Sequence, residues 1–515
     1  MDLTRENWIE LLKKRSESTP DRIIFMEYGK SSITYSEFYK KVLNTAAFLK
    51  SRFSDEEFLR PFFVSVDRDI PSLVLMLGVY AAGGWYVPVD NLLPPERASL
   101  FVKLADPIAV LLSNEHDPFA DAEINKINFS EIGDIPYFPI ASRDSASSMF
   151  GIFTSCSTGM PKLVVKNDTG ISDFIREYCT VFGFNENEIF ANQIPFYFDA
   201  STKDIFSTVL LGATTVIFPQ TVFSFPLKLI EALSETSVTT FVCVPSVLVI
   251  AAKFNAFDEM VPEKLKNILF VGEKMPVNHL NSLMRALPHV TFTNLYGSTE
   301  VAGNSCYYRV KGEVPENTVL PIGTAFNTAR VFLLDDDKKC KEEGEICVAG
   351  SGLAICYYGD REKTEAAFEH ISIPEINFEG RIYHSGDFGR INENGELICI
   401  SRKDAQIKHM GHRIELGDIE TCALSLSYIS ECCCLFSKRF EKILLFSVCD
   451  EADKKRIRKD LTRQLPKYML PHEYICLSSL PHNRNGKVDR MLLLSDWEIK
   501  EEKRINPATA DIIAH

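Results

Sequence analysis

Apolar residues gather in short runs along most of the chain, and helical and extended patterns follow one another. The run from Trp8 to Leu12 has its apolar residues at helical spacing. A second helix is expected after Thr34, with Ser36 as its N-cap, because a serine side chain can accept a hydrogen bond from the first helical turn. The pattern therefore predicts that residues 1–50 are mostly helical.

Beyond residue 50 the pattern predicts an apolar helix from Pro71 to Gly84 and a strand from Trp85 to Asp90. Further strands, alternating with helical segments, are expected at Ala109–Leu112, Thr214–Phe218, Thr239–Val244, Ile268–Val271 and Thr291–Asn294. Strand–helix alternation over hundreds of residues is typical of an α/β fold with a mostly parallel sheet. Residues 1–400 are thus predicted to form a large N-terminal domain of mostly parallel sheets flanked by helices.

The pattern changes near residue 400. Residues 386–397 predict a hairpin with an Asn-Gly turn at Asn394 and Gly395. Over residues 406–515 the helical and extended patterns alternate less regularly, which predicts a small α+β domain. We place a hinge at residues 401–405, with Asp404 as the hinge residue.

Composition limits the classes of function. The chain has 515 residues, 45% of them hydrophobic, and a formal net charge of −14, which argues against a general nucleic-acid binder. No apolar run is long enough to span a membrane, and the charged N-terminus does not resemble a signal peptide. The 14 cysteines are scattered and include no Cys-x-x-Cys pair. We therefore expect a cytoplasmic protein with reduced thiols.

The first candidate site is a hydroxyl-rich turn between two apolar runs, from Phe153 to Lys162. Hydroxyls, backbone N–H groups, a glycine and a lysine can together donate to a polyanion. It is not a Walker loop, and the simple alternative is an ordinary polar turn. The candidate ATP-binding residues here are Thr154, Ser155, Ser157, Thr158, Gly159 and Lys162.

This turn resembles the Thr-Ser-Gly-Ser-Thr-Gly-x-Pro-Lys-Gly loop of the adenylate-forming superfamily, which includes acyl-CoA synthetases, luciferases and the adenylation domains of peptide synthetases. Two residues depart from the pattern: Cys156 and Leu163 stand where the superfamily usually has glycine. Other segments resemble superfamily motifs in the same order along nearly the whole chain: residues 193–201, 294–300, 383–387, 401–404, 408–420 and 480–490.

The resemblance implies a role for each matching residue. Tyr296 would contact adenine, Thr299 the α-phosphate, and Glu300 would coordinate Mg²⁺. Asp387 would hold the ribose hydroxyls with the help of Arg402, and Asn294 and Gly297 would complete the ATP site. Lys487 would be the catalytic lysine of adenylation, with Thr299 and Glu300 beside it, and Gly411 would lie in the loop of the thioester step. The implied cofactors are ATP and Mg²⁺.

The segment around Asp199 resembles the Phe-Asp-x-Ser segment of amino-acid-activating domains, in which the aspartate binds the substrate's α-ammonium. The alternative is a helix-capping aspartate. The substrate pocket carried over from the resemblance comprises Asp199, Ala200, Lys203, Ser246, Leu269, Val271, Leu295, Gly303 and Asn304. A buried Lys203 needs an anionic partner, which favours an acidic substrate such as glutamate, unless Lys203 pairs with Asp204 instead.

The expected reaction has two steps: an amino acid and ATP give aminoacyl-AMP and pyrophosphate, and a thiol then attacks the adenylate. The acceptor would be the phosphopantetheine thiol of a separate carrier protein. Alternatives are a D-alanine–carrier protein ligase, an acyl-CoA synthetase using CoA, and a non-catalytic sensor on the same fold. The changes at Cys156 and Leu163 motivate the sensor alternative.

Overall fold

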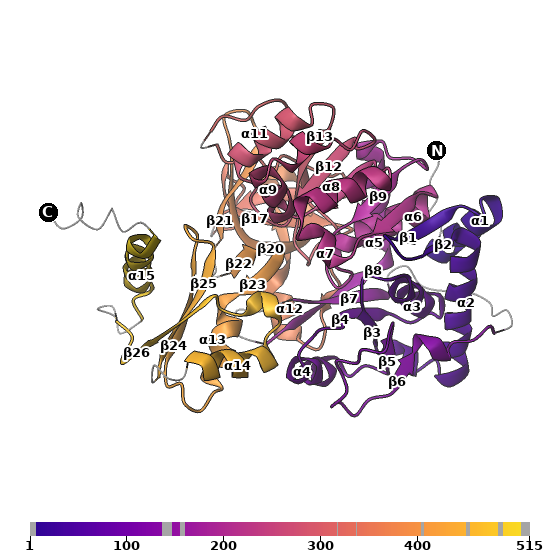
Figure 1. The fold of residues 1–515 in the computed structure, drawn as a ribbon, viewed down its shortest axis with the longest axis horizontal. Coiled ribbons are helices and arrows are strands. Elements are labelled where there is room, and N and C mark those ends of the chain that lie inside the picture. Colours follow the sequence, from indigo (N-terminus) through magenta and orange to yellow (C-terminus); the bar gives the residue numbers. More distant parts are fainter. Residues whose placement is uncertain are drawn as a thin grey trace. The chain divides into compact units, whose positions relative to one another are not determined.

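The computed structural model describes residues 7–135, 147–154, 160–316, 318–335, 337–402, 406–449, 454–482 and 488–505 (Figure 1). The chain forms two compact units. The first comprises the described parts of Met1–Asn91, Phe101–Thr154 and Lys162–Lys403. The second comprises those of Leu92–Leu100, Ser155–Pro161 and Asp404–His515. Each unit is described separately below.

The largest sheet of the first unit has nine strands in the order β15-β14-β13-β12-β11-β9-β10-β1-β2. The six strands from β13 to β1 run parallel to one another, and the two edges add antiparallel strands. The strands are β1 (Ile23–Glu27), β2 (Ser32–Thr34), β9 (Ile189–Asn192), β10 (Thr214–Ile217), β11 (Thr240–Cys243), β12 (Asn267–Val271), β13 (Thr291–Tyr296), β14 (Cys306–Arg309) and β15 (Thr324–Ala325).

The second sheet has seven strands in the order β18-β8-β7-β4-β3-β5-β6. Five of them, from β7 to β6, run parallel, whereas β8 and β18 are antiparallel to their neighbours. The strands are β3 (Phe62–Val66), β4 (Tyr86–Asp90), β5 (Val110–Leu112), β6 (Lys126–Asn128), β7 (Ser148–Thr154), β8 (Lys162–Asn167) and β18 (Cys356–Tyr357). The predicted class, mostly parallel sheets flanked by helices, is confirmed.

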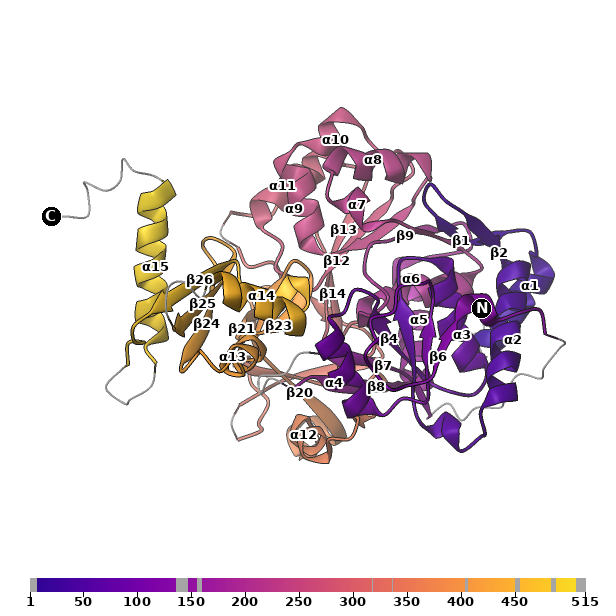
Figure 2. The same cartoon turned by 60° about the horizontal axis from the view of Figure 1, so that its bottom comes forward.

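Helices cover both faces of the nine-stranded sheet, because its central strands are apolar on both sides (Figure 2). One face carries α7 (Gln220–Phe223), α8 (Pro226–Glu235), α9 (Pro245–Lys253), α10 (Ala256–Glu259) and α11 (Val277–Ala286). The other face packs with the seven-stranded sheet around α1 (Trp8–Ser18), α2 (Tyr35–Arg52), α3 (Ile70–Ala81), α5 (Asp168–Phe182) and α6 (Thr202–Leu211). Helix α4 (Pro95–Ala105) follows β4.

A third, antiparallel sheet was not predicted as a sheet. It has the order β16-β17-β20-β19, with β21 paired to β20. Its strands are β16 (Ala329–Leu334), β17 (Glu343–Gly350), β19 (Phe368–Ile373), β20 (Phe378–Ile391) and β21 (Leu397–Arg402), and α12 (Arg361–Ala367) precedes β19. Only its last hairpin was expected, and that hairpin is confirmed, since Ile391 pairs with Leu397 and Gly395 has a φ of +75° at the turn.

One local prediction was incomplete and another was wrong. Both helices expected within residues 1–50 are present as α1 and α2, but the strands β1 and β2 between them were not predicted. The N-cap of α2 is Thr34 rather than Ser36: the Thr34 side chain accepts from the N–H of Glu37 while the Glu37 carboxylate accepts from the N–H of Thr34. This reciprocal capping box satisfies two free donors of the helix terminus, which a cap at Ser36 would leave open.

The second unit contains a two-stranded hairpin, β22 (Gln406–His409) with β23 (His412–Glu415), and a three-stranded sheet, β24 (Cys432–Ser437), β25 (Lys442–Val448) and β26 (Glu473–Leu477). Its helices are α13 (Leu416–Leu424), α14 (Lys454–Gln464) and α15 (Arg490–Ile505). This is the α+β composition that the sequence predicts. Gly411 forms the hairpin turn with a φ of +82°, a conformation that favours glycine.

Among the described helices, none combines the length and the apolar character that crossing a bilayer requires. The cysteines in the described part of the chain are all free thiols. Several are fully buried, and burial raises the pKa of the Cys306 thiol to about 12, which keeps it protonated and unreactive at neutral pH.

Candidate active site

Three residues predicted for the ATP site meet at one corner of the first unit. Tyr296 ends β13, Asp387 lies on β20, and Arg402 is its cross-strand partner on β21. The Tyr296 hydroxyl donates to Asp387 Oδ2 at 2.6 Å, and Arg402 Nη1 donates to Oδ1 at 2.7 Å. Burial raises the pKa of the Tyr296 hydroxyl well above its usual range, and the Asp387 charge acts in the same direction. The tyrosine therefore stays a hydrogen-bond donor and fixes the carboxylate.

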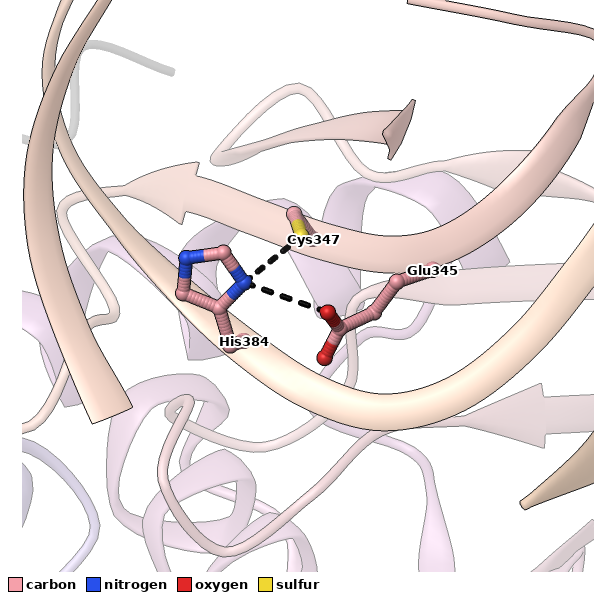
Figure 3. Close-up of side chains that lie close together, drawn as sticks. All are labelled: Glu345, Cys347 and His384. Carbon is pink, nitrogen blue, oxygen red and sulfur yellow. Dashed lines mark hydrogen bonds and ion pairs between the residues drawn. The ribbon is translucent and has the colours of Figure 1, made fainter. Parts of the chain in front are cut away.

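A cluster on the adjoining strands supports this corner (Figure 3). The side chains of Glu345 and Cys347 on β17 point toward His384 on β20, three residues before Asp387. His384 Nδ1 lies 3.3 Å from Glu345 Oε2 and 3.4 Å from Cys347 Sγ, and Nε2 lies 3.2 Å from Glu369 Oε2. The other Glu345 oxygen accepts from the Gly386 N–H at 2.9 Å. One carboxylate thus binds both the histidine and the backbone next to Asp387.

The ligand atoms of Glu345, Cys347 and His384 lie within 4.8 Å of one another, so these three could in principle hold a metal ion. The contacts of His384 already account for the cluster as an ion-pair network between two carboxylates. The hydrogen bond to Glu345 raises the pKa of His384, against the opposing effect of burial, and Glu369 acts in the same direction as Glu345. The raised pKa favours the protonated form of His384, which then bridges the two carboxylates beside Asp387.

We expect this network to weaken as the pH rises. A group whose pKa is raised by folding contributes its full stabilisation below its unfolded value, about 6.5, and loses it as the pH passes through the higher folded value. Urea midpoints should therefore fall between pH 6.5 and 9 more steeply in the wild type than in His384→Leu. His370→Leu, an exposed histidine on β19, is the control and should keep the wild-type profile. Parallel profiles for wild type and His384→Leu would contradict this role.

Lys162, Glu300 and Tyr357 form a second corner of the same unit. The Tyr357 hydroxyl donates to Glu300 Oε1 at 3.0 Å, and Lys162 Nζ lies 4.7 Å from the centre of the Tyr357 ring. Glu300 is fully buried, while Thr299 and Thr154 are half-buried. Tyr357 was not predicted, because a tyrosine among apolar residues 353–358 gives no local signal. It enters the site because β18 pairs with β8 next to Lys162.

One departure from the superfamily pattern has a structural explanation. Leu163, in place of glycine, is buried on β8 and lies opposite Phe153 on β7. A side chain at Gly151 would come within 2.8 Å of Leu163 Cδ1, so the space beside Gly151 accommodates the larger residue. Cys156, the other departure, lies outside the described residues.

Two further residues predicted for the ATP site, Asn294 and Gly297, each contact a neighbouring segment of the first unit. The Asn294 amide donates to the Pro321 carbonyl at 2.8 Å, which anchors the loop at residue 321 to β13. Gly297 follows the strand at a close approach of two backbones: a Cβ there would lie 2.8 Å from Asn304 Cα. Gly303 has a φ of +62°, and a Cβ there would lie 2.0 Å from the Phe174 ring. Glycine is therefore required at both positions, and the 294–300 segment packs tightly on 303–304.

The apolar residues predicted for the substrate pocket belong to one hydrophobic cluster. Val271 on β12 pairs with Leu295 on β13, and Leu269 lies two residues earlier on β12. Ala200 packs against the same cluster and is half-buried. Ser246, near the start of α9, is half-buried, and its N–H donates to Glu273 Oε2 at 3.0 Å. Ala200, the residue after Asp199, thus packs against the cluster that contains Leu269, Val271 and Leu295.

A buried set of four charges lies at Asp199: Lys166, Asp199, Lys203 and Asp204, called the charged quartet below. Lys166 Nζ on β8 lies 3.0 Å from Asp199 Oδ1, and the two side chains are only 1% and 7% exposed. Lys203 and Asp204, at the start of α6, are fully buried. Asp204 accepts from the Asn192 amide at 3.1 Å, whereas Lys203 Nζ has no hydrogen-bond partner among the described residues. Lys166 was not predicted, because it continues the apolar run of Leu163–Val165.

Burial is the largest influence on the pKa values of Lys203, Asp204 and Asp199. It lowers the pKa of Lys203 to about 8, although Asp199 and Asp204 act in the opposite direction. It raises the pKa of Asp204 to about 7, against the Asn192 hydrogen bond and the Lys203 charge. It also raises the pKa of the Asp199 carboxyl, opposed first by Lys166 and then by Lys203. An ionised side chain is unfavourable at such a buried position, so the charged form of each group depends on an opposite charge nearby.

Several predicted residues lie outside the described residues, namely Ser155, Ser157, Thr158 and Gly159 of the phosphate loop, the catalytic Lys487 and the hinge residue Asp404. Their roles stay predictions. Gly411 belongs to the second unit, so the structure makes no statement about its distance from the residues above.

Two family models match the chain. The model described as AMP-binding enzyme matches residues 12–358, and the model described as AMP-binding enzyme C-terminal domain matches residues 418–487. The first match covers more than half of the 515 residues. It includes the phosphate loop, the Asp199 segment and the 294–300 segment, while the second ends at Lys487.

Curated relatives and solved structures agree with these models. The chain is 29% identical to the D-alanine--D-alanyl carrier protein ligase of Bacillus cytotoxicus over 510 residues, covering 95% of this chain and 99% of that protein, and 28% identical to the ligase of Bacillus cereus over 509 residues. Its fold matches IdnL1 with a TM-score of 0.78 at 24% identity, covering 92% and 98% of the two chains. It also matches PA1221, a nonribosomal peptide synthetase protein with adenylation and PCP domains, with a TM-score of 0.81 at 23% identity over 95% and 84%. The chain therefore belongs to the AMP-binding enzyme family of the adenylate-forming superfamily and is an acid–thiol ligase that works through an acyl-adenylate.

Proposed function

We propose that this enzyme activates an amino acid as aminoacyl-AMP and transfers it to the phosphopantetheine thiol of a separate carrier protein. The observation that carries the amino-acid assignment is Asp199, a buried carboxylate whose neighbour Ala200 packs against an apolar cluster, where a substrate α-ammonium would find an anionic partner. An enzyme for fatty or aromatic acids would have no use for a buried carboxylate there.

In the first half-reaction, a carboxylate oxygen of the amino acid attacks the α-phosphorus of ATP and pyrophosphate leaves. Asp387 would accept the ribose hydroxyls, since Tyr296 and Arg402 hold its two oxygens in place. Lys162 would contribute a positive charge to the phosphates, and Lys487 would neutralise charge that develops in the displacement.

The Glu300 carboxylate fits a Mg²⁺ ion, because it is a hard oxygen donor fixed by the Tyr357 hydroxyl. Bound Mg²⁺ would neutralise the phosphates and the departing pyrophosphate. Thr299, the residue before Glu300, would donate a hydrogen bond from its hydroxyl to the α-phosphate.

In the second half-reaction, the carrier thiol attacks the acyl carbonyl, AMP leaves and the thiol proton is released. The hinge at Asp404 would allow the second unit to exchange Lys487 for the Gly411 loop between the steps. The curated relatives are named as ligases of a carrier protein, which supports a carrier as the acceptor here.

The quartet favours an acidic amino acid such as glutamate, because Lys203 has no hydrogen-bond partner among the described residues and is fully buried. D-Alanine is the second candidate, and the names of the relatives at 28–29% identity support it. Against it stands Lys203, since the methyl side chain of alanine offers no partner for an ammonium.

The acceptor is tested by mass spectrometry of a phosphopantetheinylated carrier protein incubated with enzyme, ATP, Mg²⁺ and amino acids. We expect an aminoacyl thioester on the holo-carrier and none on the same carrier without its phosphopantetheine. Formation of an acyl-CoA in a parallel reaction, with no loading of the carrier, would replace the carrier by CoA as the acceptor. Formation of neither thioester nor adenylate would support the sensor alternative.

A further inference from the structure

The charged quartet contains one lysine more than recognition of a neutral amino acid needs. Asp199 is expected to bind the substrate α-ammonium, but its Oδ1 already lies 3.0 Å from Lys166 Nζ, and both side chains are more than nine-tenths buried. A substrate ammonium that arrives at Asp199 therefore adds a third positive charge to a buried group that is already balanced.

The positive and negative charges around Asp199 can be counted with and without a bound substrate. With all four groups ionised, Lys166 and Lys203 supply two positive charges and Asp199 and Asp204 two negative ones. The carboxylate that is to be activated belongs to the phosphate side of the site, so only the α-ammonium and the side chain of the substrate enter the count. A neutral amino acid would leave three positive charges against two negative ones, and an acidic amino acid would make three against three.

Buried polar atoms without a hydrogen-bond partner lie on the quartet and on the nearby predicted pocket residue Asn304. Among the described residues, Lys203 Nζ, Asp204 Oδ1 and Asn304 Oδ1 are buried and have no hydrogen-bond partner, whereas Lys166 Nζ and Asp199 Oδ1 form the ion pair at 3.0 Å. Native interiors satisfy nearly all such groups. Three such atoms, on Lys203, Asp204 and Asn304, indicate that a polar ligand with both donors and acceptors completes the site.

We infer that Lys166 sets the charge that the substrate must carry: the quartet accepts an α-amino acid only when its side chain brings a second carboxylate. This inference rests on the proposed function and deepens it. Lys203 is fully buried and its Nζ has no hydrogen-bond partner among the residues that the structure describes, and the side-chain carboxylate would supply one. Lys166 acts through Asp199, so it is a specificity-determining residue rather than a catalytic one. Without Lys166, the remaining three charges would be balanced by a neutral amino acid.

The burial effects agree with this assignment. Burial lowers the pKa of Lys203 to about 8, so a further anion beside it would favour its charged form. An additional unpaired cation in the same volume would have the opposite effect, since like charges disfavour each other's ionisation.

The test is ATP–pyrophosphate exchange with matched substrates: glutamate and aspartate, their neutral isosteres glutamine and asparagine, and glutaramate, which is glutamine without its α-amine. Because an unpaired buried charge is strongly unfavourable, we expect the wild type to prefer the acidic amino acid over its amide by at least about 100-fold in kcat/KM. Lys166→Met, which keeps the length of the side chain and removes the charge, should lower this preference by at least about 100-fold and reverse it. Lys166→Arg should retain the preference of the wild type.

The outcomes separate the inference from the proposed function. An acid-to-amide ratio that is the same in the wild type and in Lys166→Met would overturn the inference and leave amino-acid activation standing. Exchange with glutaramate but with no amino acid would overturn amino-acid activation itself, since glutaramate also leaves the charges balanced. If Lys166→Met does not fold, the wild-type ratio decides alone, and a wild type that prefers the amide refutes the inference. No exchange with any of these five compounds overturns the inference, and exchange with D-alanine in the same assay then decides whether amino-acid activation stands.

Discussion

Asp199→Ala should destabilise the first unit by about 3–5 kcal/mol, because it leaves a buried lysine without its anionic partner. Asp199 is 6% exposed and lies 3.0 Å from Lys166. Its charge also acts to raise the pKa of Lys203. The remaining acid, Asp204, is already bound to the Asn192 amide. One carboxylate cannot balance two buried ammonium groups.

The double variant Asp199→Ala/Lys166→Met removes one charge of each sign and should recover part of the lost stability. Contacting residues commonly show coupling of about 0.5–3 kcal/mol in such cycles. Urea midpoints, followed by a probe in the first unit, should rank the wild type first, then the double variant, then Asp199→Ala. Asp55→Ala removes the exposed partner of Lys50 at 2.7 Å and should change little. A double variant no more stable than Asp199→Ala would contradict the pairing.

Asp387→Ala should raise the KM for ATP by about 100-fold or more, because the ribose would lose two hydrogen bonds to a charged acceptor, each contributing about 1.5–3 kcal/mol. The same change removes the carboxylate that accepts from Tyr296 and pairs with Arg402. Both the ligand contact and the geometry of the corner depend on this one side chain.

A matched pair provides the control for Asp387→Ala. Arg60 and Asp106 lie 2.7 Å apart, as do Arg402 and Asp387, but on the exposed surface. Asp106→Ala should leave the KM for ATP unchanged, as expected for a surface ion pair. Exchange rates measured over a range of ATP concentrations give the comparison. Equal KM values for Asp387→Ala and Asp106→Ala would remove Asp387 from the nucleotide site.

The sequence predicted the parts of the site that lie in segments resembling superfamily motifs. Tyr296, Asp387 and Arg402 are 106 residues apart at most, and the resemblance assigned all three to the ATP site before the structure showed their contacts. Each motif is a short continuous segment, so it can be detected without knowledge of the long-range packing.

Lys166 and Tyr357 show why the rest could not be predicted. Lys166 follows three apolar residues of β8, and a lysine at such a position usually marks the solvent-exposed end of a strand. Its role depends on Asp199, which lies 33 residues later in a short 3₁₀-helix, Asp199–Ser201. Tyr357 reaches Glu300 only because a two-residue strand, β18, pairs with β8. Long-range packing decides both positions, and local periodicity does not encode it.

The fold, too, was predicted from the sequence in some parts and not in others. Parallel strands such as β11 and β12 are short apolar runs between helices, and their pattern was sufficient to predict them. The antiparallel sheet from β16 to β21 was predicted only at its last hairpin, which carries an Asn-Gly turn, although burial alternates along much of β20.

The most direct test of the account is ATP–pyrophosphate exchange across the amino acids in both enantiomers, with simple carboxylic acids as controls. We predict exchange with an acidic amino acid, and loss of that exchange in Lys203→Ala. Exchange with D-alanine in both the wild type and Lys203→Ala would keep the reaction and refute the role of Lys203. Silence with every amino acid, together with turnover of a simple carboxylic acid, would contradict the central claim that Asp199 binds a substrate amine.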